Sequence, residues 1–170
     1  MESRRYIVSL SLFLKILNYL EFPEIIQIVK QYKYGEYTIL PFIESAYSKL
    51  PTINPYNIMK CCYLKNLSLP NSTYLCDNIL MMLPQLKYLA VKSGTEISPD
   101  TFRFVPELEK LEILGYGDKI LCTESVKNLC NLQELHASNS ILKNSDMQYL
   151  KNLRVLVIYD SYLNPKILEY

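Results

Sequence analysis

The chain has 170 residues, of which 49% are apolar and 21% are charged, a composition typical of a globular domain and not of a disordered or collagen-like chain. Lys and Arg (18) nearly balance Asp and Glu (17), so the net charge of +1 lacks the clustered cationic excess that nucleic-acid binding needs. Four glycines and one histidine argue against phosphate-binding glycine loops and histidine-based metal sites. We therefore expect no nucleic-acid partner, no cofactor, no metal site and no catalytic residues.

The five cysteines form no C-x-x-C pair and no His/Cys spacing of the kind that binds zinc. We interpret them as small, buried and reduced thiols of a cytoplasmic (intracellular) protein, with a redox-active pair at Cys61 and Cys62 as the alternative. An apolar run at Tyr6–Leu14 resembles a signal peptide, but Lys15 interrupts it and no small-residue cleavage site follows. No uninterrupted apolar stretch reaches ~18 residues, so we expect no membrane span.

The residues before about position 56 predict three helices. Apolar residues with i, i+3, i+4, i+7 spacing form one helical face over 10–17. A turn at 22–24, with Pro23 at a first-turn position, opens a second helix that continues to Tyr32. A third helical face is predicted from the spacing of Ile39, Ile43, Ala46 and Leu50.

A repeat begins at Cys61 and continues along the rest of the chain. Five segments share the pattern L-x-x-L-x-apolar, and they begin at Leu64, Leu86, Leu108, Leu132 and Leu153. The position three residues before each start is also apolar. All ten defining positions are leucine although leucine makes up only 28 of 170 residues, so the pattern does not arise by chance.

This pattern resembles that of leucine-rich repeat proteins over about residues 58–170. The last two apolar positions of each motif alternate as in a short strand, so both side chains point into a shared interior. The resemblance implies an α/β fold, a leucine-rich repeat solenoid of about five repeats with parallel concave strands, preceded by the three-helix module. The ninth motif position, usually Asn or Cys in the family, is Ser, Gly or Tyr here, so we expect an irregular turn after each strand.

The N-terminal stretch resembles an F-box, roughly over residues 8–50, on the segments 12–20 (LFLKILNYL) and 22–29 (FPEIIQIV). The Leu-Pro that opens the family pattern falls here on Val8 and Ser9. The resemblance implies docking on the adaptor subunit of a cullin–RING ubiquitin ligase. It assigns the adaptor contact to Leu12, Leu17, Leu20, Pro23 and Ile25. The alternative is a helical cap that covers the open apolar end of the first repeat.

Outward-pointing residues of the predicted strands form the concave face, which is polar in its middle and apolar at its end. We predict that this face binds a protein partner through Tyr88, Lys92, Lys110, Glu112, Glu134, His136, Val155, Val157 and Tyr159. We interpret the histidine as a surface residue, because no serine or cysteine is placed beside it by spacing. Since the last strand is apolar on both faces, a homodimer through this end is a further possibility.

We therefore predict two domains, a helical F-box-like or capping module at 1–55 and leucine-rich repeats at 56–170. The predicted function is that of a non-catalytic protein-interaction module. One interpretation is an F-box-type substrate adaptor whose repeats present a substrate for ubiquitination. The alternative is a plain leucine-rich repeat scaffold that binds or sequesters a partner, with the helices serving only as a cap.

Overall fold

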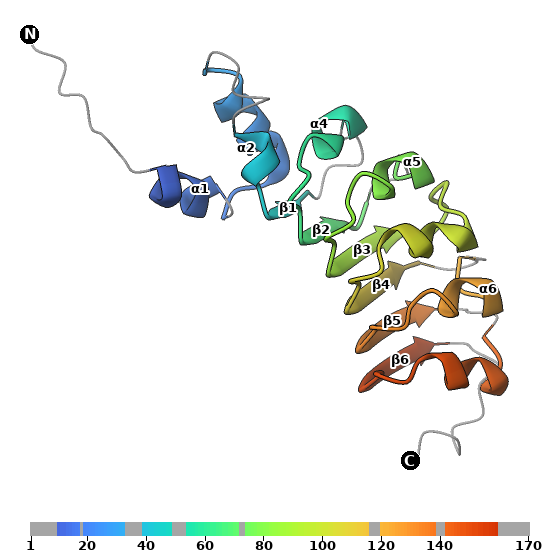
Figure 1. The fold of residues 1–170 in the computed structure, drawn as a ribbon. Coiled ribbons are helices and arrows are strands. Elements are labelled where there is room, and N and C mark those ends of the chain that lie inside the picture. Colours follow the sequence, from blue (N-terminus) through green and yellow to red (C-terminus); the bar gives the residue numbers. More distant parts are fainter. Residues whose placement is uncertain are drawn as a thin grey trace, which may run out of the picture.

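The computed structural model describes residues 10–17, 19–32, 39–48, 54–71, 74–115, 120–138 and 142–159. Within these ranges, six parallel strands form one sheet and follow one another in chain order (Figure 1). The strands are β1 (Ser45–Tyr47), β2 (Asn66–Leu69), β3 (Tyr88–Lys92), β4 (Lys110–Leu114), β5 (Glu134–Ser138) and β6 (Val155–Tyr159).

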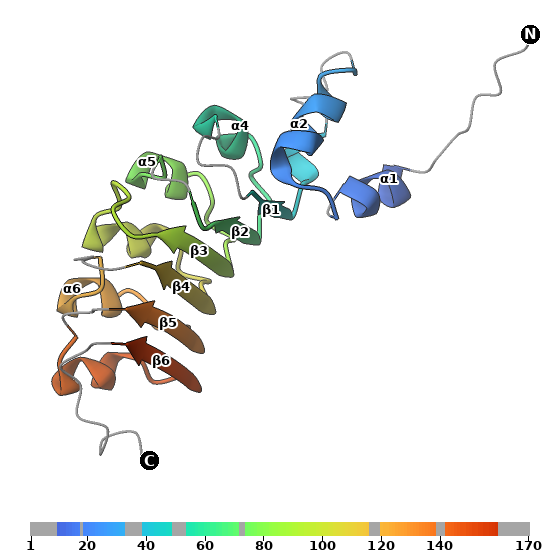
Figure 2. The ribbon, with the colours of Figure 1, turned by 180° about the vertical axis from the view of Figure 1, so that it is seen from behind.

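Short helical segments carry the chain from the end of each strand back to the start of the next. The segments between strands are α4 (Pro55–Met59), α5 (Asp77–Leu80), η2 (Pro99–Phe104), α6 (Thr123–Val126) and η3 (Asn144–Tyr149). They all lie on one side of the sheet, as the two opposite views show (Figures 1 and 2). The other side, which we call the open sheet face, has no helical layer over it. The chain therefore has a mixed α/β fold with a single parallel sheet.

The leucines of the repeat pattern occupy equivalent places in successive turns. Leu89 pairs in register with Leu67 on one side and with Leu111 on the other, and the row continues to β5 and β6. The eight motif leucines of the turns that contain β2 to β5 are each 0–1% exposed. The sequence pattern is confirmed, because each turn covers the apolar side chains of its neighbour and none could cover its own.

The apolar residue three positions before each motif has a matching role. The backbone N–H of Leu64 donates a hydrogen bond to the carbonyl of Cys61 at 2.9 Å. The same i to i−3 bond closes the equivalent turn before each of the next four strands, at 3.1 Å in every case. This tight turn aims both apolar side chains at the interior, which explains why the spacing of three residues recurs in the sequence.

The predicted third helix is wrong. Residues 40–42 form only the 3-10 segment η1 (Leu40–Phe42), and β1 follows it directly. Ile43 donates its N–H to the carbonyl of Leu40 at 3.1 Å, and Ala46 pairs with Leu67, so this stretch is a degenerate repeat turn. The spacing of its apolar residues fits a helix as well as a strand. Pairing with β2 favours the strand. The sheet consequently begins before the boundary predicted between residues 55 and 56.

The other two predicted N-terminal helices are present, as α1 (Leu10–Leu17) and α2 (Phe22–Val29), although α2 ends three residues before the predicted Tyr32. The N–H of Glu21 donates to the carboxylate of Glu24 at 2.8 Å and caps the start of α2. Four apolar side chains of α2 are buried in the same continuous core as the motif leucines. The ring of Phe13 on α1 meets that of Tyr32, just beyond the end of α2, edge-on at 5.6 Å. Helix α2 therefore extends the core of the first turn at its N-terminal end.

Carboxylates on the helical side tie neighbouring turns together. The Asp77 carboxylate, at the start of α5, accepts hydrogen bonds from the Ser98 N–H at 2.8 Å and from the Ser98 hydroxyl at 2.6 Å. Three turns later, buried Asp146 accepts from the Thr123 hydroxyl at 2.9 Å and from the Lys143 N–H at 2.7 Å. The bonds from Ser98 and from Thr123 link neighbouring turns through side chains that the repeat motif does not include.

Asp77 makes the stability of the protein depend on pH. Burial acts to raise the pKa of its carboxyl, but the two hydrogen bonds from Ser98, together with smaller contributions from Thr101 and the charge of Arg103, hold that pKa below its ordinary value. A group with a lowered folded-state pKa contributes stability above its unfolded pKa, near ~3.9, and this contribution is lost as pH falls through the folded value.

We expect Asp77→Asn to lower the free energy of unfolding by ~1–2 kcal/mol at pH 7. The difference in free energy of unfolding between the variant and the unmodified protein should become smaller as the pH is lowered below ~4. At such pH Asp77 is protonated and therefore neutral, as asparagine is. Urea denaturation at several pH values measures both effects, with exposed Asp100→Asn as the control. A difference that stays constant down to pH ~2 would contradict the assignment.

Candidate functional site

Strand register places the outward side chains of the open sheet face in rows that run across the strands. One row follows β2 to β6 as Asn66, Tyr88, Lys110, Glu134 and Val155. The next row, two residues further along each strand, contains Ser68, Ala90, Glu112, His136 and Val157. Because side chains two residues apart on a strand share a face, seven of the nine predicted partner-binding residues come together in these two rows.

Lys110 is the centre of a polar network on this face. Its ammonium group lies 3.1 Å from a carboxylate oxygen of Glu112 and 3.1 Å from one of Glu134. It also lies 5.5 Å from the centre of the Tyr88 ring, whose hydroxyl donates a hydrogen bond to Glu112 at 3.2 Å. Four side chains from three strands thus hold one another in place.

The network also sets the charge state of its members. Hydrogen bonds to Glu134 and Glu112 raise the pKa of Lys110, so its ammonium group is protonated at neutral pH. Burial and then the charge of Glu112 raise the pKa of Tyr88, which keeps its hydroxyl neutral and able to donate. The face therefore presents a fixed cation between two carboxylates.

His136 lies beside this network on the open sheet face. It pairs in register with Glu112 on β4 and with Val157 on β6, and its Nε2 atom lies 4.0 Å from a carboxylate oxygen of Glu134. That distance is too long for a hydrogen bond, and the Nε2 atom is buried without a hydrogen-bond partner among the described residues. In the described part of the chain, no serine or cysteine is hydrogen-bonded to His136, so nothing there gives it the partner that nucleophilic catalysis needs.

The apolar end of the face is formed by β6. Val155 is 39% exposed, and Val157 beside it is half-buried. Leu156 and Ile158 are also only half-buried, whereas their equivalents in β2 to β5 are buried. The last described strand thus presents apolar side chains on both of its faces.

The other predicted residues, two of the concave face and five of the F-box-like segment, lie outside these two rows. Lys92 is exposed at the end of β3, and Tyr159 ends β6 with a side chain outside the described residues. Among the F-box-like residues, Leu17 and Ile25 are 1% and 0% exposed and belong to the core. Leu20 and Pro23 are half-buried, whereas Leu12 is 52% exposed. The five do not form one accessible surface.

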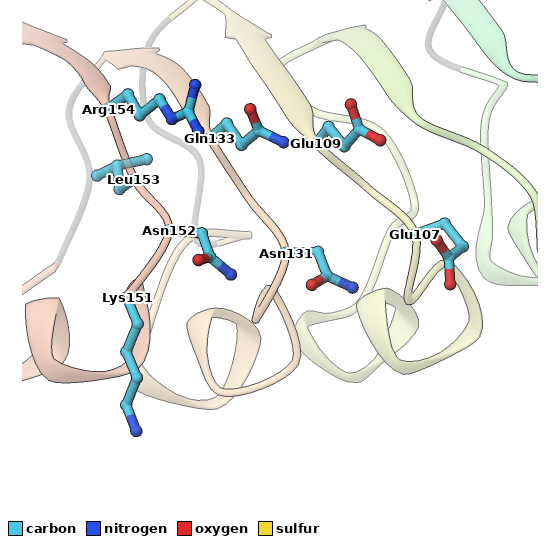
Figure 3. Close-up of a pocket in the computed structure, with 8 residues that line it drawn as sticks. All are labelled: Glu107, Glu109, Asn131, Gln133, Lys151, Asn152, Leu153 and Arg154. Atoms are coloured by element: carbon cyan, nitrogen blue, oxygen red, sulfur yellow. The ribbon is translucent and has the colours of Figure 1, made fainter.

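A hollow that the sequence analysis did not single out lies at the edge of the sheet where β4, β5 and β6 begin. Its volume is about 490 Å³, and eight residues line it (Figure 3): Glu107, Glu109, Asn131, Gln133, Lys151, Asn152, Leu153 and Arg154. We call it the edge groove. Six of its residues lie directly before or after the first leucine of a motif, and Leu153 is itself such a leucine. That periodicity is the signal that could have revealed the groove.

The cysteines differ from their prediction. Cys61 is buried, but Cys62 and Cys130 are exposed, and Cys76 and Cys122 are half-buried. Burial, and to a lesser degree the neighbouring Cys62, raises the pKa of the Cys61 thiol to about 12, so it carries no thiolate at neutral pH. In the described ranges, His, Cys, Asp and Glu form no group of three that could hold a metal ion. The helices in those ranges include none long and apolar enough to cross a membrane.

Comparison with known proteins shows a similar fold in a solved structure but no related sequence family. The sequence matches no protein-family model and none of the curated proteins. Among solved structures, the chain is similar to an internalin from Listeria monocytogenes, with 22% sequence identity and a TM-score of 0.52. The match covers 71% of this chain and 35% of the internalin chain, so this chain corresponds to about a third of that protein. The likeness is one of fold, and it supports a leucine-rich-repeat-type architecture.

Thiol labelling tests the cysteine assignment. We expect Cys62 and Cys130 to react with a thiol reagent in the native protein, while Cys61 reacts only after unfolding, because its thiol is buried and protonated. Mass spectrometry of labelled peptides from Cys62→Ala and Cys130→Ala variants separates the sites. Rapid native labelling of Cys61 would show that the turn before β2 is not packed as described.

Proposed function

We propose that this protein is a non-catalytic scaffold of the leucine-rich repeat solenoid type, whose open sheet face binds a protein partner. The observation that supports this most strongly is the juxtaposition of the Lys110 network with the exposed apolar end at β6. A contact surface with an apolar part beside fixed charges is what protein interfaces present. The fold shared with an internalin is consistent with an interaction scaffold.

The polar part of the face is organised in advance of binding. Lys110, Glu112 and Tyr88 already hold one another through the contacts described, so binding need not order these side chains. Ordering a long side chain at an interface costs ~0.5–1.5 kcal/mol, and this cost is largely absent here. Fixed charges of both signs then select partners by complementarity.

The apolar part would supply the area that a partner covers. Val155 and Val157 lie next to Glu134 and His136 in register, so one partner segment can cover both regions at once. Burying apolar side chains is worth roughly 25 cal/mol per Å². A second copy of this chain is one candidate partner for this end, and a different protein is the other.

The interpretation as an F-box-type adaptor of a cullin–RING ligase has less support than the interpretation as a plain scaffold. Leu17 and Ile25 would have to leave the core to touch an adaptor. Helix α2 is instead positioned to extend the core of the first turn, as a cap would. We propose a cytoplasmic location, because exposed thiols such as Cys62 and Cys130 persist in a reducing compartment.

Affinity capture with the full chain tests the proposed surface. We expect a protein captured by the unmodified chain to be lost with Lys110→Glu and with Val155→Asp, because each change disrupts one part of the face. Lys127→Glu is the matched control, since Lys127 follows α6 on the helical side and lies over the Tyr149 ring. Quantitative mass spectrometry compares the captures, and a melting curve confirms that each variant is folded. Capture that is unchanged in both variants, or lost equally in the control, would refute the proposal.

A further inference from the structure

The edge groove lies along a row of residues that directly precede the six strands. In chain order this row, which we call the edge row, is Glu44, Lys65, Lys87, Glu109, Gln133 and Arg154. Because the strands are parallel and in register, these residues lie side by side along one edge of the sheet. Figure 3 shows the last three of them in a line.

Opposite charges pair along the first part of the edge row. Lys65 lies 2.9 Å from Glu44, and Lys87 lies 2.6 Å from Glu109, each pair joining neighbouring turns. Hydrogen bonding to Glu109, and more weakly the charge of Glu107, raises the pKa of Lys87. Both acidic members of the row thus have a lysine partner.

Arg154, the last residue of the edge row, has no carboxylate partner among the described residues. Its neighbour in the row, Gln133, is neutral, and Glu109, two strands away, is already paired with Lys87. The ion pairs among the described residues include none to Arg154 or to nearby Lys151. The β6 end of the groove therefore carries two positive charges that the described residues do not balance.

The opposite end of the edge groove is acidic. Glu107 and Glu109 line it, and Lys87 balances only one of these two charges. Between the two ends lie amide side chains, two of which are held in place by hydrogen bonds. Asn131 donates to the carbonyl of Pro106 at 3.0 Å, and Asn152 donates to the carbonyl of Cys130 at 2.9 Å. The amide oxygen of each asparagine remains free to accept a hydrogen bond from a ligand. The middle of the edge groove is therefore polar, with its amide side chains held in place.

We propose that the edge groove binds an extended peptide segment that carries a basic and an acidic side chain two residues apart. The edge-row positions of Glu109 and Arg154 lie two strands apart, which is about 10 Å, and Glu107 lies two residues before Glu109. Side chains at i and i+2 of an extended segment leave the same face about 7 Å apart. The long side chain of a lysine spans the remaining distance to the acidic end of the groove. The carboxylate of the segment would meet Arg154, whose planar guanidinium accommodates it with two parallel hydrogen bonds. The ammonium group would meet Glu107.

This site is separate from the open sheet face, and so is its test. The probe is the blocked tripeptide acetyl-Lys-Thr-Glu-amide, added to the full chain and followed by amide NMR spectra. We expect saturable shifts at the side-chain amides of Asn131, Gln133 and Asn152. Arg154→Gln should weaken binding about tenfold, as expected when a bidentate charged contact is lost. Arg103→Gln, an exposed arginine over the Phe104 ring, should leave binding unchanged.

Results of three kinds would overturn the groove assignment. The first is the absence of saturable shifts at millimolar peptide. The second is equal binding of the neutral peptide acetyl-Gln-Thr-Gln-amide, or equal binding by the Arg154→Gln variant. The third is loss of binding in Lys110→Met with retention in Arg154→Gln, which would place the peptide on the open sheet face. The capture experiment on that face stands or falls independently of all three.

Discussion

The alternation of side chains along the short parallel strands is the constraint on which the rest of the structure depends. In β4, Leu111 and Ile113 point into the interior and are buried, while Lys110 and Glu112 point outward. Because every strand is in register with the next, one choice of face is repeated across the sheet. A shift of one residue would expose the leucines and bury the charged network, so core and surface are fixed together.

Much of the fold could be predicted from the sequence because the core is periodic. The pairs of leucines such as Leu86 and Leu89 define turn, strand and burial at once. The first turn was missed because Ile43 and Ala46 replace the two leucines, and their spacing also fits a helix. Only the pairing of β1 with β2, a contact between residues 21 positions apart in the sequence, distinguishes the two structures.

The open sheet face could also be predicted, because it follows from the same alternation. The Lys110 network could not, because alternation gives the side that a residue faces but not the neighbours that its charged end reaches. The edge groove was missed for a different reason. Its residues lie just outside the strands, where the two-residue period ends, and register along the edge is visible only once the turns are stacked.

The two surfaces differ in how their charges are satisfied. On the open sheet face the charge of Lys110 is met by two carboxylate neighbours of the same sheet. In the edge groove Arg154 and Glu107 form none of the ion pairs found among the described residues, so their charges remain available to a ligand. The scaffold can therefore present two recognition surfaces of different character on one sheet.

The most direct test of this account compares two adjacent positions of β4 by urea denaturation. Leu111→Ala should lower the free energy of unfolding by ~2–5 kcal/mol, because it leaves a cavity in the stacked core. Glu112→Ala should cost ~1 kcal/mol or less, because its partners remain partly solvated. Similar losses at both positions, or a larger loss at Glu112, would mean that the leucines do not face a shared interior.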